Sequence, residues 1–313
     1  MATAFITGAH GFIGQHLARR LAADGFQVGG LGHGAWAPSE AAAAGVRHWI
    51  NGEIAATNLA LLSASLGPPD VVFHLAGGSS VGAAIANPRE DFTRTVATTV
   101  ELLEWLRQDS PATPLVAISS AAVYGAGHDG PIAEDAHKEP YSPYGHHKLM
   151  MESLCRSYGA TYGLRSVVAR LFSVFGPGLR KQLLWDVCSR IEAGEASLTL
   201  GGTGNEMRDW TSVEDVVRAL VLLPGQASAE ARAVNVGTGI GTPVRDVVQS
   251  LVQAWGRAVP LQFSGRSRAG DPFSLVADGS RLAQLGFQWQ QDVPRALAGY
   301  VDWFRRRDGV QRS

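Results

Sequence analysis

A tyrosine and a lysine four residues apart form a candidate proton-transfer pair. Tyr144 and Lys148 belong to the segment YGHHK, and this spacing places both side chains on one face of a helix. A phenol with a pKa of about 10 exchanges protons poorly at neutral pH, but a neighbouring ammonium group stabilises the phenolate. The pair therefore suits acid–base catalysis on an alcohol. For the spacing alone, a solvated helix face is the better interpretation.

A serine pair stands at a position where α/β proteins build their sites. The apolar run at 114–119 leads into Ser119 and Ser120, in the segment SSAAVYG. Open parallel sheets bind ligands at the carboxyl ends of their strands. We therefore expect a serine hydroxyl in the same site as the tyrosine and the lysine.

Three glycines near the start of the chain predict an anion site. Gly8, Gly11 and Gly14 lie between an apolar run and a helix pattern, in the segment TGAHGFIG. At such a helix N-terminus, backbone N–H groups and the helix dipole face a pyrophosphate. We predict a dinucleotide-binding loop that includes Phe12 and Ile13.

The second predicted strand ends without an acidic residue. In NAD-type sites a carboxylate there holds the ribose hydroxyls of the adenosine, but this chain has Gly32 followed by His33. The 2′-phosphate of NADP is then not repelled, and His33 could lie near it. The sequence slightly favours NADP over NAD.

The spacing of apolar runs predicts an α/β fold with a doubly wound parallel sheet of the Rossmann type. Such runs alternate with helix-length stretches, and they lie at 2–6, 26–31, 46–50, 70–76, 114–119 and 165–172. This alternation is typical of βαβ units. We expect an NAD(P)-binding domain over 1–172, rejoined by part of 211–243, and a smaller C-terminal substrate-binding lobe from 173–210 and 244–313.

Three local signals refine the second half of the chain. We predict a helix near 212–223 and a strand at 233–237. Thr242 is expected to cap a further helix, with Pro243 at its first position.

Composition excludes several classes of protein. The 27 Lys and Arg residues balance 28 Asp and Glu residues, so no overall charge favours nucleic acid or an anionic membrane. Cys155 and Cys188 have no metal-ligand or disulfide spacing, and His146 and His147 face different directions on a helix. We expect a cytoplasmic protein with no metal site and no membrane span.

Taken together, these motifs resemble the extended short-chain dehydrogenase/reductase family, especially its nucleotide-sugar epimerases, dehydratases and reductases. The matching segments are TGAHGFIG, NGEI at 51–54, FHLAGG at 73–78, SSAAVYG, YSPYGHHK, RLFSVFGPG at 170–178, RDWTSVEDVV at 208–217, NVGTG at 235–239 and RAGDP at 268–272. The resemblance implies that Ser120 polarises the substrate oxygen and that Tyr144 is the acid/base. It also implies that Lys148 tunes the tyrosine and binds the nicotinamide ribose.

The same resemblance implies further binding residues. On the cofactor side these are Glu53 and Ile54 beside the adenine, Leu75, Ala76 and Gly77 along the central portion, and Thr95 near the nicotinamide, where relatives often have asparagine. On the substrate side they are Gln182 and Leu183 at the nucleotide end, Arg208 and Arg268 at the phosphates, and Ser173 in place of a common asparagine. Either arginine could instead pair with a neighbouring carboxylate, Asp209 or Asp271.

The expected reaction is oxidoreduction at C4 of a nucleotide-activated hexose. Dehydration is disfavoured, because the 4,6-dehydratases carry Asp-Glu where this chain has Ala121-Ala122. We slightly favour NADPH-dependent reduction of a 4-keto-6-deoxy sugar. The alternatives are 4-epimerisation through a transient ketone and a non-catalytic dinucleotide-binding protein. The expected partner is a nucleotide sugar, and a homodimer is an open possibility.

Overall fold

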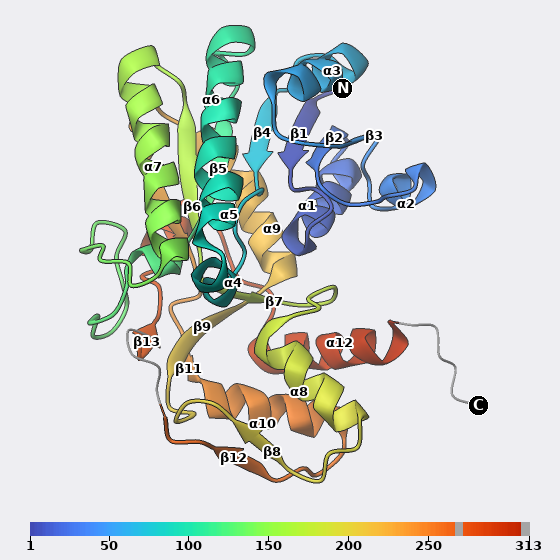
Figure 1. Cartoon of the computed structure of the whole chain (residues 1–313), viewed down its shortest axis with the longest axis vertical. Helices are drawn as coiled ribbons and strands as arrows, with labels where there is room; N and C mark the ends of the chain where they lie inside the picture. The colour runs from blue at the N-terminus through green and yellow to red at the C-terminus, as the bar shows by residue number, and fades with distance from the viewer. Residues whose placement is uncertain (267–271, 308–313) are drawn as a thin grey trace. The chain divides into compact units, whose positions relative to one another are not determined.

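The computed structural model describes residues 1–266 and 272–307, and it divides the chain into two compact units (Figure 1). The first unit comprises Met1–Gly125, Glu134–Leu171 and Val217–Val236. The second unit comprises Ala126–Ala133, Phe172–Val216 and Gly237–Ser313. The assignment of the first unit to cofactor binding and of the second unit to substrate binding stays a prediction.

A seven-stranded parallel sheet forms the centre of the first unit. Its strands, in their order across the sheet, are β10 (Ala233–Val236), β6 (Ser166–Leu171), β5 (Leu115–Ser120), β4 (Val71–His74), β1 (Thr3–Thr7), β2 (Gln27–Gly32) and β3 (His48–Asn51). Strand β1 pairs with both β2 and β4, so the strand order reverses there. In doubly wound sheets, the crevice at this reversal is where ligands bind. The predicted α/β fold is confirmed.

Helices fill the connections between these strands. They are α1 (Phe12–Ala23), α2 (Pro38–Ala43), α3 (Ala56–Leu66), α4 (Val81–Ala86), α5 (Pro88–Phe92), α6 (Thr98–Asp109), α7 (Pro143–Tyr162) and α9 (Val213–Leu222), which enters this unit at Val217. Short helices of other types are the π-helix η1 (Thr93–Ala97) and the 3₁₀ helices η2 (Ala121–Val123) and η3 (Leu223–Gln226). Helices α6 and α7 pack side by side over the sheet (Figure 1).

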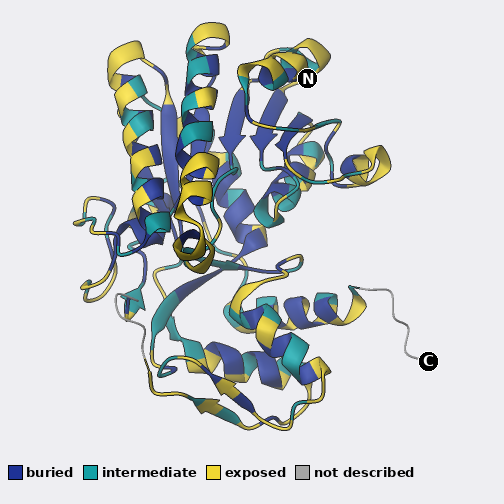
Figure 2. Cartoon of the chain, viewed as in Figure 1, coloured by how far each residue is buried: buried dark blue, intermediate teal, exposed yellow. Residues whose placement is uncertain are grey.

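The central strands are buried along their whole length because helices leave no face of the sheet in water. All residues of β1, β4 and β6 are buried, and the strands are dark blue in Figure 2. One core cluster joins the sheet to three helices, through Leu59 and Leu62 of α3, Leu102 of α6 and Met151 of α7. The parallel sheet therefore presents only its edges and strand ends for function.

A buried polar network crosses the first unit beneath the end of β5. Arg170 on β6 makes a two-pronged ion pair with Glu152 on α7, with N···O distances of 2.9 and 2.7 Å. Ser119 donates to the same carboxylate at 2.7 Å. Arg170 also donates to the hydroxyl of Tyr124 at 2.9 Å, and Tyr124 donates to Asn235 at 2.6 Å. Four elements are thereby tied together.

The second unit is built around short strands and three longer helices. Strand β9 (Met207–Ser212) pairs with β7 (Ser173–Phe175), β11 (Gly241–Pro243) and β13 (Ser274–Leu275), and β8 (Leu198–Leu200) pairs with β12 (Leu261–Phe263). The longer helices are α8 (Gln182–Glu192), α10 (Val244–Trp255) and α12 (Val293–Arg306), and α11 (Ser280–Gln284) is a short helix. Among the described residues, every helix is too short or too polar to span a bilayer.

The predicted cap at Thr242 is wrong. Thr242 and Pro243 lie in β11, where Thr242 pairs with Arg208 of β9. Pairing with β9 holds this segment extended, so α10 begins at Val244 with Pro243 as its N-cap residue. The predicted helix near 212–223 and the strand at 233–237 are confirmed as α9 and β10.

The buried ion pair generates a stability prediction. Glu152→Gln should lower the free energy of unfolding by about 3–5 kcal/mol, because it leaves the Arg170 guanidinium buried without its counter-charge. Urea denaturation measures this change. Glu101→Gln, at an exposed position of α6, is the matched control, and its free energy of unfolding should stay within about 0.5 kcal/mol of the wild-type value. Equal stability of the two variants would contradict the prediction.

Candidate active site

The glycine loop has a geometry that only glycine permits. Gly8 has a φ of +76°, and a Cβ there would lie 2.8 Å from the backbone nitrogen of Ala76. A Cβ on Gly14 would lie 2.3 Å from the carbonyl oxygen of Gly8. Helix α1 starts after Gly11, which supplies no side chain to cap the first N–H groups. The loop therefore leaves a bare backbone cradle at a helix N-terminus, which fits the pyrophosphate of a dinucleotide. Phe12 and Ile13 form the first turn of that helix.

The region expected to meet the adenosine carries an ion pair. His33 follows β2, and its Nε2 lies 3.5 Å from a carboxylate oxygen of Glu53, which follows β3. Both side chains are mostly exposed. Ile54 is buried in the core cluster, so only its backbone can face a ligand. A carboxylate thus stands beside the histidine that we expected near a 2′-phosphate.

A buried histidine holds the ends of β1 and β4 together at the reversal of strand order. His74 Nδ1 lies 2.7 Å from the hydroxyl of Thr7, and Nε2 lies 3.0 Å from the hydroxyl of Thr99 on α6. Burial, aided by the charge of Lys148, lowers the pKa of His74 to about 3. A neutral imidazole therefore fixes the starting point of the segment Leu75–Gly77.

That segment passes close to the predicted catalytic lysine. Gly77 has a φ of +142°, and a Cβ on it would lie 3.2 Å from both Lys148 Nζ and Thr95 Oγ1. The Gly78 N–H donates to Thr95 Oγ1 at 2.8 Å. Thr95 is fully buried in the π-helix η1, a helix type often found at functional sites. Predicted cofactor residues from the loop after β4, from η1 and from α7 therefore meet at one point.

The three predicted catalytic residues also meet. Ser120 ends β5 and hydrogen-bonds with the phenol of Tyr144. Ser142 caps α7 by accepting from the Gly145 N–H at 3.3 Å, which places Tyr144 in the first turn of the helix. Lys148 lies one turn later, with Nζ 6.0 Å from the centre of the tyrosine ring. Ser119 points the other way, into the buried network.

In the protein without ligands, the pKa shifts of Tyr144 and Lys148 differ from the expected tuning of the tyrosine by the lysine. Burial raises the pKa of Tyr144, the hydrogen bond with Ser120 opposes that rise, and the charge of Asp91 adds to it. Burial lowers the pKa of Lys148 to about 8, against the charges of Asp91 and Glu152. Desolvation disfavours both charged forms, so the lysine alone does not bring the phenol into a neutral working range.

A buried acid–imidazole pair lies next to these residues. His147 Nδ1, on α7, is 2.5 Å from Asp91 Oδ2, on α5. The two side chains are 11% and 5% exposed. Asp91 belongs to none of the predicted motifs, and 56 positions separate it from His147, so no spacing rule connects the two residues. Only the packing of α5 against α7 reveals the pair.

The predicted substrate residues belong to the second unit, except Ser120. Ser173 lies on β7, opposite Trp210 of β9, and Arg208 lies two residues earlier on β9. Gln182, with a left-handed φ of 67°, and Leu183 begin α8. Arg268 lies outside the described residues. The structure thus places Ser173 and Arg208 on neighbouring strands.

The alternative role for Arg208, an ion pair with Asp209, gains no support. Asp209 is buried and accepts hydrogen bonds from the backbone N–H groups of Thr238, Gly239 and Ala277 at 2.8, 2.9 and 3.2 Å. Arg208 donates to the carbonyls of Met207 and Phe273 at 2.8 and 3.2 Å. The carboxylate therefore organises loops of the second unit.

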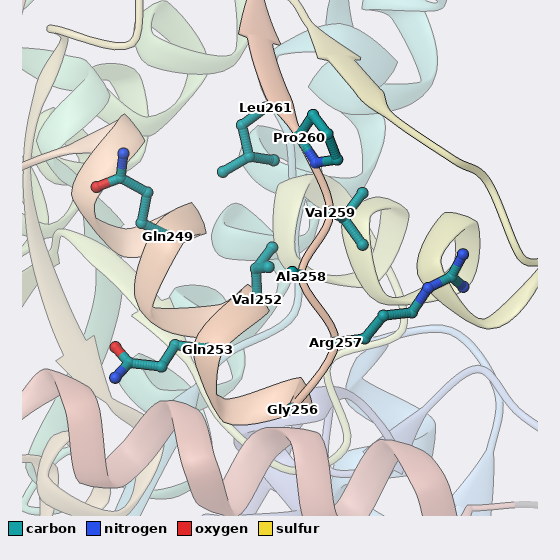
Figure 3. Close-up of a pocket in the computed structure, with 9 residues that line it drawn as sticks. All are labelled: Gln249, Val252, Gln253, Gly256, Arg257, Ala258, Val259, Pro260 and Leu261. Atoms are coloured by element: carbon teal, nitrogen blue, oxygen red, sulfur yellow. The ribbon is translucent and has the colours of Figure 1, made fainter.

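A cavity of about 640 Å³ lies elsewhere in the second unit (Figure 3). Its lining comes from α10, β12 and the connection between them: Gln249, Val252, Gln253, Gly256, Arg257, Ala258, Val259, Pro260 and Leu261. None of these is a predicted site residue. The Arg257 guanidinium donates to the carbonyls of Ile191 and Gly194, so it supports the wall. Within residues 1–266 and 272–307, no group of three His, Cys, Asp or Glu side chains could hold a metal ion.

Comparison with known proteins identifies relatives along nearly the whole chain. A family model described as the NAD dependent epimerase/dehydratase family matches residues 4–237. The chain is 31% identical over 326 residues to a UDP-glucose 4-epimerase of Azospirillum brasilense, across 98% of this chain and 89% of the relative.

Solved structures agree with this result. MoeE5 in complex with UDP-glucuronic acid and NAD matches with a TM-score of 0.85 and 30% identity, over 98% of this chain and 100% of that one. A UDP-glucuronic acid 4-epimerase from Bacillus cereus, in complex with UDP-glucuronic acid and NAD, matches with a TM-score of 0.86 and 26% identity, over 97% and 99%.

The glycine cradle generates a binding prediction. Gly8→Ala should weaken NAD binding at least tenfold. The added Cβ would collide with the Ala76 backbone, and the alanine would have to adopt the positive φ of Gly8. Gly25→Ala is the matched control: its φ is +89°, yet nothing lies within 4 Å of its Cβ position. Titration of tryptophan fluorescence measures both affinities. An equal loss in the two variants would assign the effect to backbone strain alone.

Proposed function

Because the chain belongs to the NAD dependent epimerase/dehydratase family, we propose that it is an NAD-dependent 4-epimerase of a nucleotide-activated hexose. The observation that carries this proposal is the meeting of Ser120 and Tyr144 with Lys148 beside the Gly77 turn. These groups serve oxidation of a carbinol and reduction of the resulting ketone equally well.

Epimerisation replaces the reaction that the sequence slightly favoured. Reduction of a 4-keto-6-deoxy sugar needs the same serine, tyrosine and lysine, so these residues alone do not separate the two reactions. The comparisons support epimerisation, since the A. brasilense relative and the B. cereus structure are both named 4-epimerases. The coenzyme would then be returned at each turnover instead of being consumed.

Tyr144 carries the proton in this proposal. Its phenolate oxygen takes the proton of the C4 hydroxyl as the C4–H bond breaks, and gives it back when the ketone is reduced from the opposite face. Ser120 positions the reacting oxygen by a hydrogen bond. When bound, NAD would supply the hydride acceptor and donor for C4, and its positive charge would favour the phenolate form of Tyr144.

Lys148 holds the centre of the site together. Its Nζ donates to the Ile118 carbonyl at 2.9 Å, which fixes the ammonium at the end of β5. From there it is placed to bind the nicotinamide ribose, as the family resemblance implies. Its remaining N–H groups are the donors available for the ribose hydroxyls.

We propose UDP as the nucleotide, since the matching structures hold UDP-sugars. Arg208 and Arg268 would meet the diphosphate, where guanidinium groups offer paired donors. Gln182 and Leu183 would meet the nucleotide end, and Ser173 the sugar side. A homodimer and a cytoplasmic location remain expectations.

NAD is the proposed coenzyme, although Gly32 alone slightly favours NADP. The Glu53 carboxylate beside His33 would repel a 2′-phosphate, and both matching structures contain NAD. The carboxylate that follows the neighbouring strand β3 would thus take over the discrimination against NADP that the end of β2 lacks.

A direct assay tests the proposed function. The purified protein is incubated with NAD and UDP-glucose, or with UDP-glucuronic acid, and the products are separated by chromatography while NADH absorbance is followed. We expect the 4-epimer of one substrate, without net NADH. In a parallel incubation with NADPH and a 4-keto-6-deoxy nucleotide sugar, net consumption of NADPH would instead establish the reductase. NAD binding without any product in either incubation would establish the non-catalytic alternative.

Tyr144 generates a catalytic prediction. Tyr144→Phe should lower turnover by about 10²–10⁴, the range for a positioned acid–base group, while folding stays intact by circular dichroism. Tyr162→Phe makes the same chemical change at an exposed tyrosine of α7 and should leave turnover unchanged. Near wild-type turnover of a folded Tyr144→Phe variant would show that another group carries the proton.

Glu53 generates a coenzyme prediction. Wild-type protein should bind NAD more tightly than NADP, and Glu53→Gln should narrow that difference by about fivefold, as expected for one exposed charge worth about 1 kcal/mol. Calorimetric titration with each coenzyme at low salt measures the ratio. Glu101→Gln is the control. An unchanged ratio in Glu53→Gln would remove the carboxylate from coenzyme selection.

A further inference from the structure

Lys148 is a buried cation, and burial by itself disfavours its charge. The residue is 3% exposed, and its Nζ donates to the Ile118 carbonyl at 2.9 Å. A carbonyl group is neutral, so this hydrogen bond alone does not offset the free energy of removing an ammonium group from water. The charged form is also the better partner for the nicotinamide ribose, because it has three N–H donors. A nearby carboxylate is needed to keep the lysine in this form.

The charges of two carboxylates reach Lys148, and one of them already has a counter-charge. Burial lowers the pKa of Lys148 to about 8, while the charge of Asp91 and then that of Glu152 oppose this fall. Glu152 makes the two-pronged ion pair with Arg170, at N···O distances of 2.9 and 2.7 Å. The guanidinium offsets much of the effect of Glu152 at a distance. Asp91 is therefore the carboxylate left to balance the lysine.

Asp91 lies against the same turn as the lysine. Its side chain is 5% exposed, and a Cβ on Gly78 would lie 1.7 Å from Asp91 Oδ1. One residue earlier in the turn, a Cβ on Gly77 would lie 3.2 Å from Lys148 Nζ. Glycine at both positions lets the carboxylate and the ammonium group approach the same turn. The two charges are thus held near one another in a place sheltered from water, where screening is weak.

His147 fixes the position of the Asp91 carboxylate. Its Nδ1 lies 2.5 Å from Asp91 Oδ2, across the contact between α7 and α5. A carboxylate only accepts hydrogen bonds, so the imidazole donates in this contact. One carboxylate oxygen is therefore held by His147, and the other lies against Gly78. The hydrogen bond and the charge can be removed separately, by substitution of the histidine or of the aspartate.

The other titratable groups around Lys148 bring no second counter-charge within the described part of the chain. Burial, aided by the charge of the lysine, lowers the pKa of His74 on β4 to about 3, so this imidazole is neutral. Burial raises the pKa of Tyr144, so the phenol is neutral as well. Arg94 of η1 pairs with Glu90 of α5 at the surface. Helix α4 has the sequence VGAAIA and contains no titratable side chain.

We propose that Asp91 is a positioning residue whose buried charge keeps Lys148 in the ammonium form that binds the nicotinamide ribose. Asp91 acts through the lysine and needs no contact with substrate or coenzyme. The inference rests on the proposed function, because that function assigns Lys148 to the ribose.

A charge role and a tethering role of Asp91 predict different pH profiles of NAD binding. Neutral Lys148 is a poorer partner for the ribose, so NAD affinity should begin to fall near pH 8 in the wild type. Asp91→Asn removes the charge that opposes the effect of burial, and it should move this onset down by about one pH unit. His147→Asn keeps the carboxylate and should keep the wild-type onset. If Asp91 only ties α5 to α7, both variants weaken binding at every pH and neither moves the onset.

The experiment is calorimetric titration with NAD from about pH 6 to about pH 10. Lys148→Met should abolish the onset, with or without Asp91→Asn, which assigns it to the lysine. Glu90→Gln removes an exposed carboxylate from the same helix and is the matched control that should cause no shift. Binding is measured instead of turnover because the charge of Asp91 also adds to the rise in the pKa of Tyr144, so turnover would combine two effects.

Two results would overturn the inference: a wild-type onset in folded Asp91→Asn, or an equal downward shift in His147→Asn. Circular dichroism verifies each fold. Asp91→Ser, with a smaller uncharged side chain, provides the same test where Asp91→Asn does not fold.

The titration separates this inference from the proposed function because it needs no sugar. The expected onsets together with a negative epimerase assay would count against the proposed function alone. Epimerase activity with the same onset in wild type and Asp91→Asn would count against the inference alone. Failure of the wild type to bind NAD would overturn both.

Discussion

The buried ion pair between Arg170 and Glu152 is the interaction on which the candidate site depends. Two N···O distances below 3 Å join β6 to α7, and Ser119 attaches the end of β5 to the same carboxylate. Side chains alternate along a strand, so anchoring Ser119 on one side directs Ser120 to the other. The register between the serine and the helix that carries Tyr144 is thus set by charges far from water.

Burial orders the side chains of this site, but it also disfavours their charged forms. It raises the pKa of Tyr144 and lowers that of Lys148 to about 8, so the ligand-free protein disfavours both charged forms. Within the protein, the hydrogen bond with Ser120 opposes the rise in the pKa of Tyr144. The charge of bound NAD would complete the balance, which links readiness for catalysis to coenzyme binding.

Much of this architecture follows from short-range patterns. Apolar runs of strand length predicted the sheet, and the glycine spacing predicted a loop whose close backbone approach at Gly8 is visible in the structure. The cap expected at Thr242 failed because pairing with β9, a strand more than thirty positions earlier, holds that residue extended. The sequence slightly favoured reduction, whereas the comparisons give more support to epimerisation. Both reactions use the same side chains, so residue types cannot separate them.

By itself, the sequence determined the α/β fold and the identity of the candidate catalytic residues, because period, glycine spacing and helix spacing are local properties. Tertiary structure alone decided which charges surround them. Asp91 meets His147, and Glu53 meets His33, across different elements of the fold. Electrostatic effects depend on distance and burial rather than on position along the chain, and those quantities exist only once the chain has folded.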